Sequence, residues 1–216
     1  RNIKKKNIKK VNGIVLLNSD WCYFYKNGCY PIFEANNKNL SDSICFLNKV
    51  KKKYAEIYIK DTNYEYPFYE KKTKNHSKNN FTTFSRDEIY KLNNLDKFVT
   101  KRNWQKIIIR GDVLPVCSYL GTTFMELMAN DIPHILFYRP SHYNINDKFK
   151  KYMRQLQKYN FKFFNPENAA KFLLKNRFEI INLWNKSDFI NFRKEFRNEF
   201  CYQESNWKKN FSKLII

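Results

Sequence analysis

Residues 117–140 read "CSYLGTTFMELMANDIPHILFYRP", and this pattern decides the fold class. An apolar run ends near Ser118, a turn follows at Gly121, a helical stretch begins with "TFMELMAN", and "DIP" leads into a second apolar run. The chain has only 4 Gly, so a glycine at this turn needs a physical reason. Strand, tight turn, helix and strand in this order form the repeating unit of an α/β sheet.

Five short apolar runs recur along the chain, and a helical or irregular stretch follows each of them. Runs of this length, apolar on both faces, are typical of parallel strands buried between two layers of helices. The sequence therefore predicts one Rossmann-like α/β domain over residues 1–216, with a parallel sheet of about five strands flanked by helices. The predicted strands are 13–17, 56–59, 113–118, 135–138 and 161–164.

The segments between these runs have helical periodicity. In "SDSICFLNKVKKKY" the apolar residues recur at helical spacing, and Ser41 or Asp42 is predicted as the N-cap. In "INDKFKKYMRQLQKY" one apolar stripe is predicted to pack on the core instead of forming a binding platform. Asn165 is predicted to cap the helix that starts with "NPENAAKFLL", since Pro166 fits its first position.

Other regions depart from this alternation. Residues 186–216 contain phenylalanines at helical spacing and predict C-terminal amphipathic helices that pack on the domain. Residues 67–85 are polar and without periodicity, so we expect a mobile loop or an insertion there. Pro115 is unexpected in a central strand because it has no N–H to donate, and we expect it near the start of its strand.

The composition indicates one domain with reduced thiols. A chain of 216 residues with 43% hydrophobic content can bury one substantial core. It has no apolar run that approaches the length of a membrane helix, which is roughly 20 residues. Its basic first residues are not followed by the longer apolar region of a signal peptide. The 5 Cys form an odd set without CxxC spacing, which favours reduced thiols and a cytoplasmic protein.

The formal net charge of +21 raises the question of a nucleic-acid partner. Only 9 of the 41 basic residues are Arg, although Arg is the residue that phosphate- and base-binding surfaces favour. Lys, Asn, Ile, Tyr and Phe are abundant together, as A+T-rich codons produce without selection for a ligand. We therefore predict no specific nucleic-acid partner, while a peripheral contact with an anionic membrane surface stays open.

Several cofactor motifs are absent from the sequence. It has no GxGxxG, no GxxxxGK[ST] and no GxSxG, which argues against dinucleotide binding, a P-loop and a nucleophile elbow. His76, His134 and His142 lack metal-ligand spacing and no Asp-x-Asp occurs, so we predict neither a metal nor a cofactor. His134 is expected to be structural. His142 and Arg139 are candidates for a site, although Arg139 can equally pair with a surface carboxylate.

The turn at Gly121 is the best candidate site, because ligands of such sheets bind beyond the carboxyl ends of the strands. Gly121 allows a tight turn or the close approach of a phosphate. Thr122 and Thr123 offer hydroxyl and N–H groups at a helix N-terminus, and Glu126 lies about one turn further, within reach of a nucleotide's sugar hydroxyls. An equally good interpretation is a Thr N-cap with Glu126 at the third helical position, a capping box that only stabilises the helix.

Three segments together resemble a known family. They are "GTTFMELMANDIPHILFYRP", "NPENAAKFL" and "FRKEFRNEFCYQESNWKKNF". The first resembles the donor-binding half of GT-B glycosyltransferases. Residues 112–211 as a whole resemble the C-terminal region of transferases encoded in bacterial surface-carbohydrate (lipopolysaccharide) gene clusters, so that the resemblance covers roughly half of the chain.

The resemblance implies one half of a GT-B fold and a nucleotide-sugar donor. Residues 121–123 would approach the diphosphate, and Glu126 would hold the ribose. Basic groups after the first two strands assist the leaving diphosphate in that family, and the corresponding residues here are Lys26 and Lys60, although the first loop lacks the family's glycine-rich turn. The resemblance also implies a carbohydrate or lipid-linked acceptor, an N-terminal acceptor domain for which this chain has no room, and electrostatic catalysis without a metal.

Two alternative functions remain open. A glycerophosphate or polyol-phosphate transferase with a CDP-linked donor shares the fold, whereas a basic nucleic-acid-binding domain would have no enzymatic role. The Gly-Thr-Thr turn with Glu126 favours the two transferases.

Overall fold

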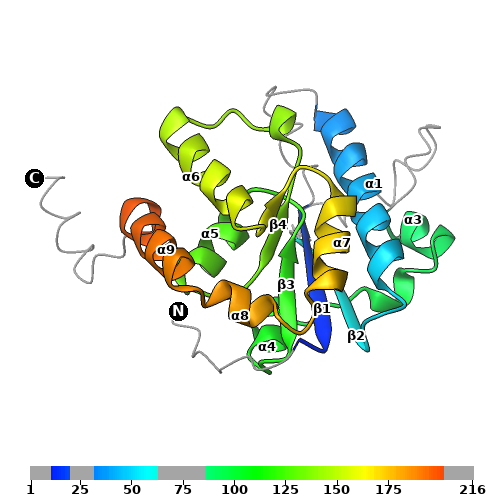
Figure 1. The fold of residues 1–216 in the computed structure, drawn as a ribbon. Helices are drawn as coiled ribbons and strands as arrows, with labels where there is room; N and C mark the ends of the chain where they lie inside the picture. Colours follow the sequence, from blue (N-terminus) through cyan, green and yellow to red (C-terminus); the bar gives the residue numbers. More distant parts are fainter. Residues whose placement is uncertain (1–10, 20–31, 63–85, 202–216) are drawn as a thin grey trace, which may run out of the picture.

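The computed structural model describes residues 11–19, 32–62 and 86–201 (Figure 1). Their strands form one five-stranded sheet in the order β2-β1-β3-β4-β5, and every neighbouring pair is parallel. Each strand overlaps one predicted apolar run, so the prediction of a Rossmann-like parallel sheet is confirmed. The strands are β1 (Gly13–Ser19), β2 (Glu56–Thr62), β3 (Val113–Cys117), β4 (Ile135–Phe137) and β5 (Lys162–Phe163).

A single residue extends the sheet beyond β2. Val99 forms a parallel bridge with Ile59, and the N–H of Thr100 donates to the Ile59 carbonyl at 2.9 Å. With this bridge counted as a reduced strand, the strand order becomes that of the Rossmann fold, whose order reverses between β1 and β3. The carboxyl ends of β1 and β3 are therefore the place where this sheet is expected to bind a ligand.

Pro115 lies in the middle of β3, a central strand, so the expectation that it lies near the start of its strand is wrong. The N–H of Ser118 donates to Leu17 of β1, so that alternate residues of β3 direct their N–H groups toward β1 and the residues between them toward β4. Pro115 belongs to the second set, and β4 pairs with β3 only from Val116 onward. The missing N–H of Pro115 therefore faces a part of the sheet where β4 has not yet begun.

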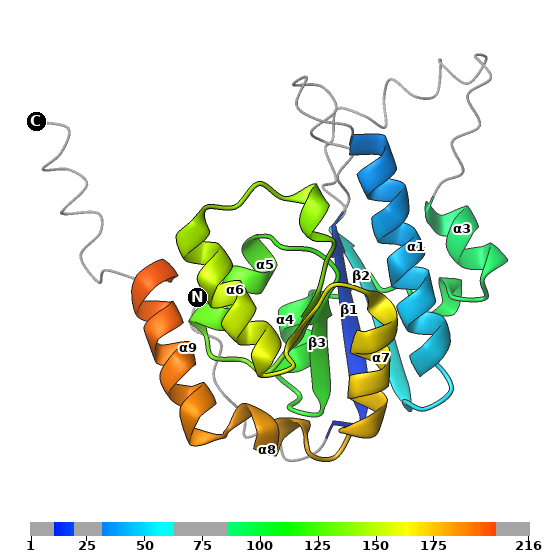
Figure 2. The same cartoon turned by 45° about the horizontal axis from the view of Figure 1, so that its top comes forward.

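Helices cover both faces of the sheet. Helices α1 (Ile32–Val50) and α7 (Pro166–Lys175) lie side by side on one face (Figure 1), and α4 (Trp104–Ile108) and α5 (Thr122–Ala129) lie on the other (Figure 2). The described residues also contain α3 (Arg86–Leu92), α6 (Asp147–Lys158), α8 (Ile180–Trp184), α9 (Ser187–Phe200) and the short 3-10 turns Asp96–Phe98 and Pro140–His142.

Of the two predicted helix starts, that of α7 is confirmed and that of α1 is wrong. Helix α1 begins at Ile32, so Ser41 and Asp42 lie inside the helix and the prediction that either is its N-cap is wrong. The physical reason is tertiary: Asp42 is bound by Arg139, so a polar residue inside the helix does not mark its end. The start of α7 is as predicted, since Asn165 Oδ1 accepts from the N–H of Asn168 at 2.8 Å.

The C-terminal helix α9 packs on α5 and α6 through aromatic side chains. The Phe196 ring lies 6.0 Å from that of Phe124 and 5.9 Å from those of Phe149 and Tyr152, measured between centroids. The prediction that the apolar stripe of α6 packs on the core is therefore confirmed. No helix among the described residues is long and apolar enough to cross a membrane.

Some predictions concern residues outside the described part of the chain. These are the mobile loop or insertion at 67–85, the end of the C-terminal helices at 202–216, Lys26 and His76. The described cysteines Cys45, Cys117 and Cys201 are free thiols.

Candidate functional site

A buried polar network joins the carboxyl ends of β1 and β3. Ser118 Oγ donates to Asn18 Oδ1 at 2.7 Å, and Asn39 Nδ2 of α1 donates to the same oxygen at 3.2 Å. Asn18 Nδ2 donates in turn to Tyr90 Oη of α3 at 3.2 Å. All four side chains are buried, and a hydrogen-bonded buried network fixes the groups that it joins. It therefore holds the start of the loop after β3 at the point where the strand order reverses.

A tyrosine ring explains the glycine in this loop. An ideal Cβ on Gly121 would lie 2.5 Å from Cε2 and 2.8 Å from Cδ2 of Tyr119. The tyrosine is only 6% exposed, and its Oη shares a hydrogen bond of 2.7 Å with Thr123 Oγ1. The backbone of Gly121 is extended, with φ −162° and ψ −166°. The glycine is therefore required by the close approach of this ring and not by an unusual backbone conformation.

Replacing Gly121 with Ala should lower the free energy of unfolding by about 1–3 kcal/mol, because the new methyl group forces the Tyr119 ring out of its place. Urea denaturation followed by circular dichroism measures this loss. In a Tyr119→Ala background the same Gly121→Ala change should be nearly neutral, since the ring that conflicts with the Cβ is gone. An equal loss in both backgrounds would show that the glycine serves a different purpose.

The N-terminus of α5 follows directly from this turn. Gly121 is the N-cap residue and has no side chain with which to cap. The N–H of Met125 is the first to bond back along the helix, to the Gly121 carbonyl at 3.2 Å. The N–H groups of Thr122, Thr123 and Phe124 precede that bond, so they form the positive end of the helix dipole. Such an end attracts phosphate groups and other anions.

The side chains of this first turn have different surroundings. Thr122 and Glu126 are exposed, whereas Thr123 is buried and its hydroxyl is engaged by Tyr119. Glu126 is the fifth helical residue and not the third, and the N-cap makes no side-chain hydrogen bond. The alternative of a Thr–Glu capping box is therefore wrong. Glu126 remains an exposed carboxylate one turn from the N-terminus of α5.

A second tyrosine holds the loop from the side of β4. Tyr143 Oη accepts a hydrogen bond from the N–H of Leu120 at 3.1 Å. Burial raises the pKa of Tyr143, so its phenol stays protonated at neutral pH. A pocket of about 390 Å³ lies between this tyrosine, Gly121 and Met125 of α5, and Phe149 and Phe200 of α6 and α9.

Arg139, the first residue after Tyr138 at the end of β4, pairs with a carboxylate of α1. Its Nε and Nη2 each donate to one oxygen of Asp42 at 2.7 Å. This forked geometry is the strong form of an arginine–carboxylate pair, and it raises the pKa of Arg139. The arginine therefore connects the loop after β4 to α1. Of the two roles that the sequence allowed for Arg139, a site residue or the partner of a carboxylate, the structure shows the second.

The remaining predicted residues lie at different distances from the turn. Lys60 of β2 is in register with Leu17, which is in register with Cys117 of β3. Because neighbouring strands are about 4.8 Å apart, the backbone of Lys60 lies roughly 10 Å from that of Cys117. His142 ends the 3-10 turn after β4. The structure thus brings Gly121, Thr122, Thr123 and Glu126 together, with Arg139 and His142 on the neighbouring loop.

Sequence analysis missed the residues that hold the loop in place. Asn18 and Ser118 are polar residues at the ends of apolar runs, and this position is a usable signal for a strand end that faces a site. Tyr119 and Tyr143 gave no such signal, because the sequence is rich in tyrosine throughout, with 15 Tyr. Their role depends on hydrogen bonds across the loop, to Thr123 and Leu120.

Among the described residues, no group of three or more His, Cys, Asp or Glu side chains could hold a metal ion.

Comparison with known proteins assigns the chain to a family. No curated protein and no solved structure matches the chain. A model described as "LIC12162 family transferase" matches residues 1–215. Since this match extends over nearly every residue of the sequence, the chain belongs to the LIC12162 family of transferases.

Proposed function

We propose that this chain binds a nucleotide-sugar donor and takes part in glycosyl transfer for the synthesis of a bacterial surface carbohydrate. Membership of a transferase family supports a group-transfer reaction. The parallel Rossmann-like sheet supports a nucleotide ligand, because this fold binds nucleotides where its strand order reverses. The resemblance of the Gly121 stretch to GT-B glycosyltransferases, and of residues 112–211 to transferases of surface-carbohydrate gene clusters, supports a sugar as the transferred group.

One observation carries this proposal. The loop after β3 lies where the strand order reverses, passes directly into the N-terminus of α5, and is followed one turn later by the exposed carboxylate of Glu126. A diphosphate fits the N–H groups at such a terminus. A carboxylate one turn away accepts hydrogen bonds from the hydroxyls of the attached ribose.

The proposed chemistry is electrostatic stabilisation of the leaving group. As the glycosyl bond breaks, negative charge develops on the departing nucleoside diphosphate, and fixed dipoles aimed at that charge lower the barrier. The N–H groups of Thr122, Thr123 and Phe124 are such dipoles, and the polar network around Ser118 holds the loop that positions them. Lys60 and His142 are the proposed additional cationic or proton-donating groups. We propose a carbohydrate or lipid-linked acceptor and a cytoplasmic location for this reaction.

Replacing Glu126 with Gln should weaken donor binding by roughly tenfold or more. A hydrogen bond to a charged acceptor contributes on the order of 1.5–3 kcal/mol, and the substitution removes the charge while it keeps the size of the side chain. Calorimetric titration of wild type and variant with UDP, GDP, ADP and CDP measures the effect. The melting temperature should stay unchanged, because Glu126 makes no capping bond.

The matched control is Glu195→Gln on α9, which removes an equally exposed carboxylate on a different helix. It should leave nucleotide affinity unchanged. Equal affinities of wild type and Glu126→Gln for every nucleotide would exclude Glu126 from the site. Tightest binding of CDP would favour the CDP-linked polyol-phosphate donor over a nucleotide sugar.

A further inference from the structure

A buried lysine without a counter-ion lies at the edge of the sheet. Lys162, the first residue of β5, is 3% exposed. Its Nζ lies 5.3 Å from the ring centroid of Tyr138 and 4.1 Å from that of Phe164. Among the residues that the structure describes, none accepts a hydrogen bond from this amine or pairs with it as a carboxylate. The like charge of Arg154 on α6 also acts on it.

This arrangement disfavours the charged form of Lys162. Burial, together with repulsion from Arg154, lowers the pKa of Lys162 to about 8. The amine is therefore still mostly charged at pH 7, in surroundings that favour its neutral form. A desolvated amine that lines a pocket and has no carboxylate partner among the described residues is a candidate for binding an anionic ligand.

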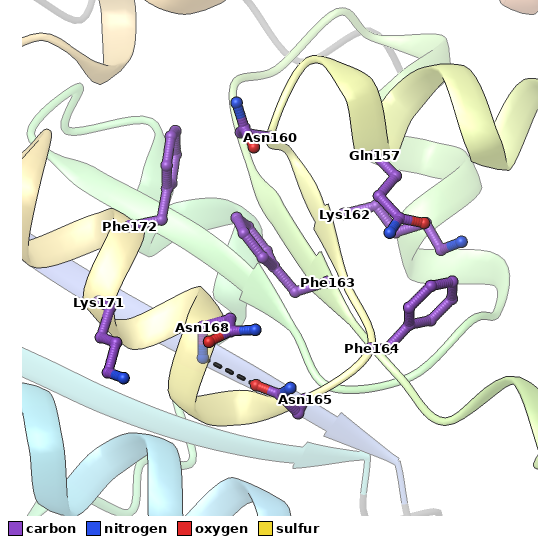
Figure 3. A pocket seen from close by; sticks show the side chains of 9 residues that line it. All are labelled: Gln157, Asn160, Lys162, Phe163, Phe164, Asn165, Asn168, Lys171 and Phe172. Atoms are coloured by element: carbon purple, nitrogen blue, oxygen red, sulfur yellow. Dashed lines mark hydrogen bonds between the residues drawn. The ribbon is translucent and has the colours of Figure 1, made fainter.

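Lys162 lines a pocket along the free edge of β5. The pocket has a volume of about 460 Å³, which is suited to a small ligand. Figure 3 shows Gln157, Lys162 and Phe164 on one side of the strand, with Asn168 and Lys171 of α7 on the other. Phe164 is 43% exposed and offers an aromatic surface beside the amine of Lys162.

The backbone of β5 adds polar groups to the same pocket. The carbonyls of Phe161 and Phe163 accept from the N–H groups of Leu136 in β4 and of Tyr138, the residue after β4. Because peptide groups alternate along a strand, the N–H and carbonyl of Lys162 point away from β4, toward the edge of β5 that pairs with no other strand among the described residues. Side-chain amides both donate and accept hydrogen bonds, and a sugar hydroxyl also does both.

We propose that the β5-edge pocket binds an anionic sugar, namely a hexose that carries a carboxylate or a phosphate group. Lys162 binds the anionic group, Phe164 packs against the apolar face of the ring, and the amides of Gln157, Asn160 and Asn168 bind its hydroxyls. Lys171 supplies a second positive charge at the mouth of the pocket. This pocket is separate from the loop at Gly121, so it is a second site and does not depend on the proposed donor.

Titration calorimetry of the whole chain at pH 7 tests the proposal. The probes are glucuronate and glucose 6-phosphate, which distinguish a carboxylate from a phosphate, with neutral glucose and inorganic phosphate as comparisons. At least one anionic sugar should bind, and Lys162→Met should weaken its binding at least tenfold. Glucose and inorganic phosphate should each bind at least tenfold more weakly than that sugar. Lys158→Met, which removes an exposed lysine near the end of α6, should have no effect.

Thermal melts supply a second readout. Lys162→Met should raise Tm at pH 7 by about 1–2 °C, because it replaces a partly desolvated amine with an apolar side chain of similar length. A saturating anionic sugar should raise Tm of the wild type and leave Tm of Lys162→Met unchanged.

Three results would overturn the proposal: neither anionic sugar binds, Lys162→Met binds as tightly as wild type, or inorganic phosphate alone binds as tightly as the sugar. Glu126→Gln should keep its affinity for the anionic sugar. A failure of the donor assignment and a failure of this second site therefore give different results.

Discussion

Arg193→Met should lower the free energy of unfolding by about 3–5 kcal/mol, the loss expected when one partner of a buried ion pair is removed. The side chain of Arg193 is 3% exposed, and its Nε donates to Asp131 Oδ1 at 2.7 Å. Its Nη1 donates to the Trp184 carbonyl, and its guanidinium lies 4.4 Å from the Trp184 ring centroid. The substitution leaves a buried carbonyl and a carboxylate with fewer donors. Urea denaturation measures the loss.

Arg197→Met is the matched control for this prediction. Arg197 binds the same carboxylate at 2.9 Å, but its side chain is 24% exposed, so its removal should cost about 1 kcal/mol or less. Equal losses for the two variants would mean that the burial of Arg193 is not what makes its pairing important.

Acid should destabilise the protein through His134. The imidazole is fully buried, with Nδ1 2.7 Å from the Ile132 carbonyl and its ring packed between Phe124 and Trp184. Burial lowers the pKa of His134 from 6.5 to about 4. Between these two values the unfolded chain binds the proton and the folded chain does not, so stability falls as the pH falls. The full loss is about 3 kcal/mol below pH 4.

Urea denaturation between pH 7 and pH 4 measures this contribution. Protonation of carboxylates also destabilises the folded protein in acid. The informative quantity is therefore the difference in unfolding free energy between wild type and His134→Leu at each pH. The variant should lose about 3 kcal/mol less than wild type over this range. An identical pH profile for wild type and His134→Leu would refute the role of His134.

The strands could be predicted from the sequence, but their complete order could not. Apolar runs such as 13–17 and 113–118 are buried on both faces, and a strand of this kind has a clear signal. The reduced strand at Val99 has no signal of its own, because one bridged residue has no periodicity. Its partner Ile59 lies 40 positions away in the sequence.

The location of the candidate site could be predicted from the sequence, but the contacts that shape it could not. The turn at Gly121 and the helix start after it follow from the order of run, glycine and threonines. The contact that requires the glycine comes from Tyr119, two residues earlier, and ring packing across a turn is not visible in a linear pattern. Arg139 and Asp42 lie 97 positions apart, so only the folded chain shows that their charges pair.

The start of α1 shows the same limit. Polar residues such as Ser41 and Asp42 favour helix ends when no other partner is present. Here Asp42 has a partner on another element, so the helix continues through it. Tertiary contacts of this kind override local preference.

One turn of α1 contacts the ends of three strands. Asn39 bonds to the network of β1 and β3, and Asp42 binds the residue that follows Tyr138 after β4. Proteins open in cooperative units whose members share such contacts. The loops after β3 and β4 therefore belong to one opening unit with α1, and neither can exchange its amide hydrogens through local opening without disturbing the contacts of the other.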